Sequence, residues 1–410
     1  MDVFGSLFPG SSIEKYEGGR IHQGDIKNLA RVAKESDDYI TKVRPYRKSD
    51  GIKHAEDFIT TFHDPTIERS WLAEKLGKSS TGDEYSFELW FSDGKLRFMI
   101  KTPSKGERAE MTKELNGLYP NAKIYESERH MPKIPHDAYI AGGELSLKKT
   151  KYAPIRSFSG PDPFEKEKIE ESEQVGTVLI DPYKSILSEL IGHQNQAILF
   201  QVTFRPAPFD WTDGHGPFDP PAERVSEYLM EGRYVDSYWN PRIIPPTEKD
   251  KRTAEHVSDL EESQAFEVNI RFFVTASERR QAERNAEAIE NTVTTHYQNG
   301  QVAQQLEATR FGHEEVKDEL VNAAKRKVES NGTILTKTEL AALAHLPNET
   351  IEKSKVDFVD SVVGGHAPGS AAQANKDSIE DKGAENTESQ CSFKRSLASF
   401  LAQLDRAGVV

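Results

Sequence analysis

The sequence predicts an α+β protein with two ferredoxin-like modules, each an antiparallel sheet with helices on one face. Asp93-Gly94 lies between two β-rich runs, YSFELWF and LRFMI, and an Asp-Gly turn in that setting is a strong hairpin signal. A strand that carries Arg-Phe and precedes a charged, Glu-rich helix occurs twice, beginning at Leu96 and at Ile270. A hairpin, a helix and a strand make most of a ferredoxin-like module. The repeated pattern therefore predicts two related modules, although strand-then-helix is also a common coincidence.

The first module is expected at residues 84–152, after a mixed helix and loop region at residues 1–83 that shows no clean periodicity. A charged helix over residues 104–118 and a strand over residues 122–125 follow the hairpin. Residues 139–147 read as a further strand, and its Gly-Gly pair predicts a bulge.

The second module is expected at residues 153–300. It begins with an amphipathic helix over residues 181–191 and a buried strand over residues 197–204, and it resumes with a strand over residues 267–275 and a long helix to His296. Between these parts, residues 207–264 are rich in Pro, Gly and aromatic residues. We read them as an irregular insertion with one short helix near residues 222–230.

A helical C-terminal region is expected over residues 301–362, with a capped helix at residues 336–346. Thr336 and Glu339 have the spacing of a capping box. Three leucines at steps of three share one broad side of this helix and are candidates for docking a partner: Leu340, Leu343 and Leu346. The alternative is that they pack on the second module.

The last part of the sequence predicts a disordered linker at residues 363–390 and an amphipathic terminal helix at residues 391–410. The linker is polar and contains almost no large apolar residue. The terminal stripe consists of Phe393, Leu397, Phe400, Leu401 and Leu404. A tethered amphipathic helix suits a groove on a partner, and folding back onto the chain itself is the equal alternative.

Composition excludes several classes of protein. The net charge of −14 disfavours a protein that coats DNA, because phosphate neutralisation needs clustered Lys and Arg. A single cysteine, Cys391, excludes an intrachain disulfide and a thiolate-rich zinc site. No apolar run reaches the ~18 residues of a membrane-spanning helix. These features predict a soluble cytoplasmic protein.

The sequence shows no catalytic constellation, so we predict no enzyme and no cofactor. Gly19 and Gly24 have the outer spacing of a P-loop, but Asp25 and Ile26 stand where phosphate and magnesium need Lys and Ser or Thr. A plain turn is the better interpretation. No G-x-S-x-G nucleophile elbow and no His-x-His pair of the kind relaxases use is present.

Two weaker candidate sites have plain alternatives. Asp210, Asp213 and His215 share one loop and could hold a metal, although such Gly-Asp-rich segments are usually only turns. A basic cluster, followed by an aromatic residue, could contact nucleic acid or could be an ordinary solvated edge: Lys148, Lys149 and Lys151.

The segment ILTKTELAALAHLPN resembles the connection between the N-terminal region and the motor domain of conjugative DNA-transfer ATPases of the type IV secretion and HerA/FtsK-like class. Five other segments are similar in order and character, so the resemblance spans about residues 84–350: SFELWFSDGKLRFMIKTP, LYPNAKIY, KYAPIRSF, ILFQVTFRPAPFDW and FEVNIRFFVTAS.

The resemblance implies a non-catalytic accessory or scaffold subunit of a DNA-transfer machine that works with a separate motor ATPase. Where the family has a P-loop, an acidic strand end and an arginine finger, this sequence has a polar tail, so none of the ATPase residues is carried over. Such a subunit would be cytoplasmic, at the membrane through its partners, and homo-oligomerisation stays open. The alternatives are a nucleic-acid-binding module, a structural protein of a virus or plasmid, and a metal-dependent hydrolase that uses Asp213 and His215.

Overall fold

The computed structural model separates residues 1–360 from residues 361–410 as two compact units, and all described residues lie in the first. The structure describes residues 19–35, 39–49, 51–63, 82–127, 130–157, 181, 183–184, 196–208, 210–214, 220–235, 242–260, 263–300, 302–329, 333–348, 350–351 and 355–359. The terminal stripe from Phe393 to Leu404 and most of the predicted helix at 181–191 lie outside these ranges.

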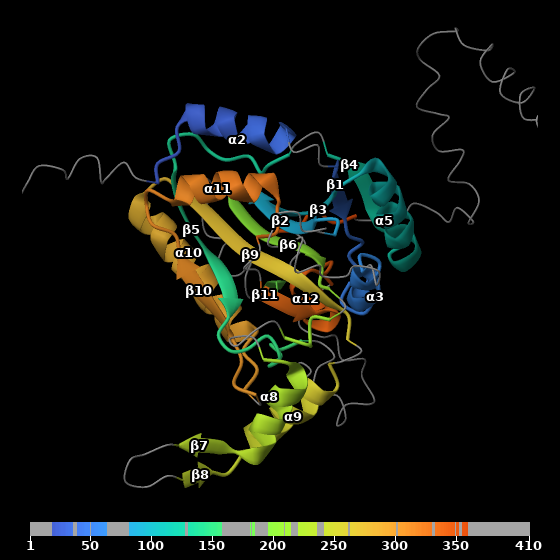
Figure 1. The fold of residues 1–410 in the computed structure, drawn as a ribbon. Helices are drawn as coiled ribbons and strands as arrows, with labels where there is room; N and C mark the ends of the chain where they lie inside the picture. The colour runs from blue at the N-terminus through green and yellow to red at the C-terminus, as the bar shows by residue number, and fades with distance from the viewer. Residues whose placement is uncertain are drawn as a thin grey trace, which may run out of the picture. The chain divides into compact units, whose positions relative to one another are not determined.

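One antiparallel sheet organises the first unit (Figure 1). Its strands follow the order β10-β5-β9-β6-β2-β3-β1-β4, and β11 extends the β5 side of β9. The nine strands of this sheet, within the described residues, are β1 (Tyr39–Arg44), β2 (Tyr85–Ser92), β3 (Lys95–Thr102), β4 (Lys123–Glu126), β5 (Tyr139–Leu147), β6 (Ile198–Pro206), β9 (Ala265–Ala276), β10 (Leu306–Arg310) and β11 (Thr333–Thr336).

Two ferredoxin-like modules lie side by side in this sheet. In the first, β1, β2, β3 and β4 are arranged as β4-β1-β3-β2; in the second, β5, β6, β9 and β10 are arranged as β10-β5-β9-β6. Both are therefore the order 4-1-3-2. Pairing between β2 and β6, for example Leu89 opposite Phe200, joins the modules into one sheet. The predicted α+β class with two ferredoxin-like modules is confirmed.

The predicted module boundaries need correction. The first module begins with β1, inside the region expected to be mixed helix and loop, and β5 opens the second module rather than closing the first. The sequence of β1 shows no regular alternation of polar and apolar residues, because the two faces of the strand contact different cores. Ile40 and Val43 enter opposite cores, and Thr41 is buried beside them.

Helices cover both faces of the sheet. The larger core lies under α3 (Ala55–Thr60), α5 (Lys105–Leu118) and α10 (Arg279–His296); the smaller one lies under α2 (Gln23–Glu35) and α11 (Val316–Lys325). Strand side chains alternate between these cores. Along β2, for example, Leu89 enters the larger core and Trp90 the smaller one.

The two Arg-Phe strands occupy equivalent places, since β3 leads into α5 and β9 leads into α10. Phe98 and Phe272 are fully buried in the larger core, which confirms them as packing residues. The bulge predicted at Gly142-Gly143 is wrong, because the pairing of β5 with β9 continues through both residues. A Cβ at Gly142 would lie 2.5 Å from the carbonyl oxygen of Phe272, so close backbone approach explains this glycine.

The predicted insertion contains more regular structure than expected. Its helices α8 (Ala222–Glu231) and α9 (Glu248–Ser258) pack together, and β7 (Arg233–Val235) pairs with β8 (Arg242–Ile244) between them in the chain. These elements lie below the sheet in Figure 1. The Ser226 hydroxyl donates to the carbonyl oxygen of Ala254 at 3.0 Å and ties the two helices together.

The capped helix is present as α12 (Lys337–Leu343), with both hydrogen bonds of the predicted capping box. Leu340, Leu343 and Leu346 are buried in the larger core, with exposed fractions of 0, 0 and 2%. Their assignment as partner-docking residues is therefore corrected: they pack inside the chain. Among the described helices, none combines the length and the apolar character that crossing a membrane requires.

Candidate binding cleft

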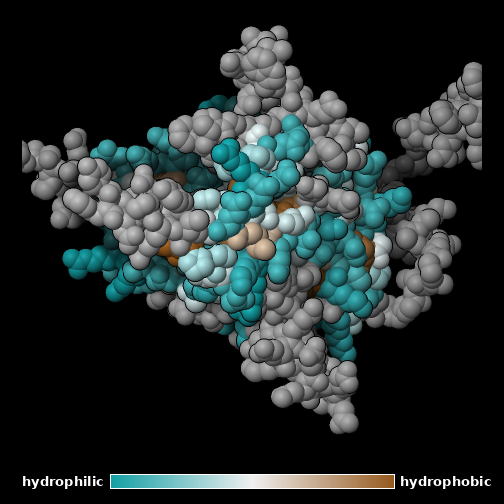
Figure 2. Space-filling model, turned by 60° about the horizontal axis from the view of Figure 1, so that its bottom comes forward, coloured by the Kyte–Doolittle hydropathy of each residue, from teal (hydrophilic) through white to brown (hydrophobic). Residues whose placement is uncertain are grey.

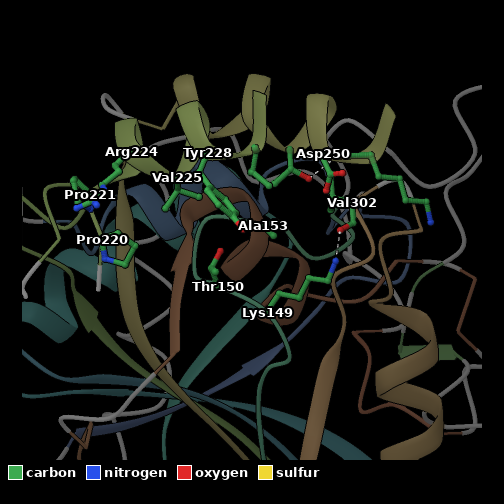
Figure 3. A pocket seen from close by; sticks show the side chains of 13 residues that line it. Lys149, Thr150, Ala153, Pro220, Pro221, Arg224, Val225, Tyr228, Asp250 and Val302 are labelled. Atoms are coloured by element: carbon green, nitrogen blue, oxygen red, sulfur yellow. Dashed lines mark hydrogen bonds between the residues drawn. The ribbon is translucent and has the colours of Figure 1, made fainter. Parts of the chain in front are cut away.

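An open cleft of about 680 Å³ lies between α8 and the chain that follows β5 (Figure 3). Its volume falls within the usual range for ligand sites. The lining is mainly apolar on its sides and charged at its ends. It consists of Lys149, Thr150, Ala153, Pro220, Pro221, Arg224, Val225, Tyr228, Leu229, Lys249, Asp250, Thr253 and Val302.

Buried polar groups of the second module hold the floor of the cleft. The Gln304 side chain, which has no exposed surface, donates to the carbonyl oxygens of Thr150 and Ala153 at 3.1 and 2.9 Å and accepts from the Lys149 backbone N–H at 2.9 Å. The buried Tyr152 hydroxyl donates to the carbonyl oxygen of Pro220 at 2.9 Å. The floor is therefore fixed without any contribution from a ligand.

Helix α8 forms the opposite wall with an i, i+3, i+4 apolar set: Val225, Tyr228 and Leu229. The other side of the helix, with Ala222 and Ser226, faces the base of the insertion and α9. Tyr228 is 53% exposed although it is a large side chain that lines an apolar cleft. Val225 is partly buried against the cluster that contains Ala222, so Tyr228 and Leu229 form the more open part of this apolar set.

Exposed large apolar residues gather on the insertion. Of the four in the described residues, Tyr228, Met230 and Ile244 lie there, and Tyr125 lies on β4. Figure 2 is turned so that the bottom of Figure 1, where the insertion lies, comes forward. This face is largely hydrophilic, with small pale and brown areas near its centre. Tyr228 is the one of these residues that lines the cleft.

The cleft is positively charged within an acidic chain. Lys149, Arg224 and Lys249 supply three positive charges and Asp250 one negative charge, so the lining carries a net charge of +2 (3 − 1), against −14 for the whole chain. Arg224 lies at the end near Pro221, and Lys149 and Asp250 lie toward the other end (Figure 3). Asp250 is engaged by the capping box of α9, where it accepts from the Thr247 backbone N–H at 2.9 Å.

The predicted basic cluster is divided by the structure. Lys149 lines the cleft, and its Nζ donates to the carbonyl oxygen of Val302 at 3.2 Å. Lys148 is exposed on the same segment, and the Lys151 Nζ lies 5.1 Å from the centre of the Tyr152 ring. Contact of these three lysines with nucleic acid stays a prediction.

The predicted metal residues do not form a site in the part of the chain that the structure describes. Asp210 and Asp213 belong to one turn, in which the Asp213 backbone N–H donates to the Asp210 carbonyl oxygen at 3.0 Å. His215 lies outside the described residues. Across the described ranges, no three His, Cys, Asp or Glu side chains are gathered where they could hold a metal ion.

The P-loop-like segment separates into two structural elements. Gly19 adopts a φ of 80° in a turn, whereas Gly24 and Asp25 begin α2. The Asp25 carboxylate accepts from the His22 backbone N–H at 2.8 Å and from Lys317 Nζ at 3.0 Å. The interpretation of the segment as a plain turn therefore holds at Gly19 but is wrong for Gln23 and Gly24, which belong to α2.

A buried ion pair crosses the smaller core. The Glu88 carboxylate accepts from Arg326 Nε at 2.6 Å, from Trp90 Nε1 at 2.6 Å, from Ser86 Oγ at 2.8 Å and from Gln201 Nε2 at 2.9 Å. Burial favours a higher pKa of Glu88, but the Arg326 charge and these hydrogen bonds outweigh it and lower the pKa. Both side chains are within 1% of complete burial, so the pair is closed to a substrate, and removal of one partner would leave the other as an uncompensated buried charge.

A second buried cluster links α12 to the segment around Asp181. His345 Nε2 lies 3.3 Å from Asp181 Oδ1, and the His345 ring stacks on Tyr183 with 4.1 Å between centroids. The Tyr183 hydroxyl donates to the Leu343 carbonyl oxygen at 2.7 Å, and burial raises the pKa of this tyrosine well above its ordinary value. Asp181 and His345 have no exposed side-chain surface. The geometry resembles part of a catalytic triad, but it is closed to solvent and connects α12 to the segment around Asp181.

A family model described as "Domain of unknown function (DUF8128)" matches residues 13–358. The chain belongs to this family. The matched span includes every described element of the sheet and the insertion, so the cleft lies within the part of the chain that defines family membership. No curated protein matches the sequence.

Solved structures provide only distant similarity. A mutant chlorite dismutase from Candidatus Nitrospira defluvii, in complex with cyanide, shares 8% identity, with 71% of this chain and 98% of that chain covered and a TM-score of 0.16. A second mutant of the same enzyme gives 8% identity, 70% and 96% coverage, and a TM-score of 0.15. Scores this low support no argument about this chain.

Sequence reasoning missed most of the cleft. It singled out Lys149 and the helix that became α8, but not Arg224, Tyr228 or Lys249. The apolar spacing in α8 was a usable signal. The placement of that helix opposite the chain after β5, about 75 residues away in sequence, could not be predicted without the sheet topology.

Proposed function

We propose that this chain is a non-catalytic accessory subunit of a DNA-transfer machine, located in the cytoplasm or at the membrane through its partners, and working with a separate motor ATPase. The observation that carries the proposal is the contrast between its reactive and its apolar groups. Two buried pairs, Glu88 with Arg326 and Asp181 with His345, are closed to solvent, whereas three of the four exposed large apolar residues found in the described ranges lie on the insertion. A surface of this kind suits binding better than catalysis.

The DNA-transfer context is supported by the resemblance described above. The segments that carry it correspond in part to β2, β3, β4, β6, β9 and α12, which form the sheet and one of its covering helices. In the resembled family, the segment equivalent to α12 leads into the motor. Here α12 packs into the larger core of the chain.

Affinity purification of the full chain from its native cells tests the proposal. We expect a motor ATPase or another DNA-transfer subunit to co-purify in stoichiometric amount, and the purified chain alone to hydrolyse no ATP. Recovery of no such subunit, or ATP hydrolysis that persists after stringent removal of contaminants, would contradict the proposal.

The nucleic-acid alternative is tested separately with a labelled single-stranded oligonucleotide. It requires binding that weakens with salt and is lost when Lys148, Lys149 and Lys151 are replaced by Glu. Absence of binding at low salt would remove this alternative.

A further inference from the structure

The geometry of the cleft points to one occupant: we propose that it binds an amphipathic helix of the partner subunit, with an apolar face in the middle and carboxylates at both ends. This inference rests on the proposed function, since it names the chemistry of the partner.

The apolar part of the cleft has the length and spacing of a helix-binding groove. Helix α8 contains 10 residues, which corresponds to about 15 Å of helix. Over that length a partner helix presents anchors at i, i+4 and i+7, or about two turns. Tyr228, Leu229 and the partly buried Val225 line the α8 wall, and Ala153 lies across from Val225 and Tyr228 (Figure 3).

The charges of the lining select a partner with acidic ends. Arg224 and Lys249 form no ion pair within the described residues, and the hydrogen bond from Lys149 to Val302 uses one of three N–H donors of its ammonium group. Arg224 lies near one end of the cleft and Lys149 near the other. Carboxylates at the two ends of a docked helix would meet these cations, and its apolar middle would meet the α8 wall.

The same charges disfavour a nucleic acid as the occupant. A strand carries a phosphate at every nucleotide and needs a continuous basic track with several stacking aromatics. The lining offers cations toward its ends and one exposed aromatic residue, Tyr228.

The direct test uses the full chain and a synthetic fluorescein-labelled helical peptide of about 15 residues, with Leu and Phe anchors and Glu at both ends. Fluorescence anisotropy should show saturable binding that weakens as salt rises. A peptide with Lys in place of Glu, and one with Gln in place of its apolar anchors, should each bind at least about tenfold more weakly. Equal binding of all three peptides, or no binding of the first, would overturn the inference.

Variants then assign the binding to the cleft. Tyr228→Ser should weaken binding of the acidic peptide about 30-fold, as for an aromatic hot spot, and Arg224→Glu should weaken it about 5- to 10-fold. Both residues are exposed, so circular dichroism and thermal melting should match the wild type. Lys105→Glu, at an exposed lysine that opens α5, is the matched control and should bind like the wild type. Unchanged binding in the first two variants would overturn the inference.

Competition separates the remaining possibilities. Displacement of the peptide from the cleft by a single-stranded oligonucleotide at equal concentration would overturn the proposal in favour of a nucleic acid. If the peptide does not bind but a motor subunit still co-purifies, the inference fails and the proposed function stands. If the peptide binds and no DNA-transfer subunit is recovered, the proposed function fails while the preference of the cleft is supported.

Discussion

Replacing Arg326 by Met removes the cation that pairs with Glu88 between the sheet and α11. The Arg326 and Glu88 side chains are 0 and 1% exposed, and 2.6 Å separates Arg326 Nε from Glu88 Oε1. The variant leaves a buried carboxylate with only the neutral donors of Ser86, Trp90 and Gln201. Removal of one partner of a buried pair lowers the free energy of unfolding by about 3–5 kcal/mol, which is a large part of the stability of a typical protein.

The pH dependence of this loss identifies its cause. In the wild type the pKa of Glu88 is lowered, so its contribution is present above the unfolded-state pKa and is lost as pH falls through the folded-state value. Without Arg326, burial dominates and raises the pKa of Glu88 above its ordinary value of 4.5. Protonation of Glu88 then removes the unpaired buried charge in the variant. The difference in free energy of unfolding between wild type and variant should therefore narrow as pH falls from about 7 to 5.

Equilibrium urea unfolding, followed by circular dichroism, measures these differences. The double variant Glu88→Gln with Arg326→Met should recover about 1–3 kcal/mol relative to the sum of the single variants, because no buried charge is left. Arg31→Met is the control: its ion pair with Glu35 is about 60% exposed and should be worth less than about 0.5 kcal/mol. A loss below about 1 kcal/mol in Arg326→Met, or strict additivity in the double variant, would refute the reasoning.

Three further predictions concern the packing around α12. Leu343→Ala should lower the free energy of unfolding by about 2–5 kcal/mol; a change too small to measure would mean that this leucine is not in the core. Gly51→Ala should cost about 1–3 kcal/mol, because the new Cβ would lie 2.0 Å from the Leu346 carbonyl oxygen, whereas Gly24→Ala meets no atom within 4 Å and should be neutral or stabilising in the same melting assay. Burial raises the pKa of Glu339, so the wild type should gain stability over Glu339→Gln as pH falls from about 7 toward 4.5; a constant difference across that range would contradict this assignment.

The sheet of the second half and the hairpin of the first could be predicted because their signals are local. The Asp93-Gly94 turn takes the positive φ angles, 52° and 72°, that favour these two residue types, and β2 and β3 pair on either side as expected. The capping box of Thr336 and Glu339 is also a local signal, and both of its hydrogen bonds form.

The elements that could not be predicted depend on long-range contacts. β1 carries Thr41 and Lys42 within six residues and becomes a strand only because β3 and β4 flank it. The burial of Leu343 follows from packing of α12 beside α3, which is distant in sequence. For the same reason, the sequence identified a stripe of leucines but could not decide whether it faces a partner or the core.

The cleft was hidden from sequence reasoning for a related cause. Lys149 looked like one member of a basic run, whereas the structure places it opposite α8, in a lining that also includes Lys249. In the sequence, Tyr228 looks like any helical residue, because its 53% exposed side chain is known only from the structure. The charged and the apolar residues of the cleft come from segments that are far apart in the sequence and meet only in the folded second module.

Photo-crosslinking in native cells tests the central claim, that this chain works by binding a partner subunit through its insertion. p-Benzoylphenylalanine would replace Tyr228 in the cleft and, in a separate matched variant, Tyr125 on β4, since these tyrosines are 53 and 42% exposed. We predict an ultraviolet-dependent adduct with a DNA-transfer subunit from position 228 and none from position 125. Adducts of equal yield from both positions, or no protein adduct from position 228, would contradict the account.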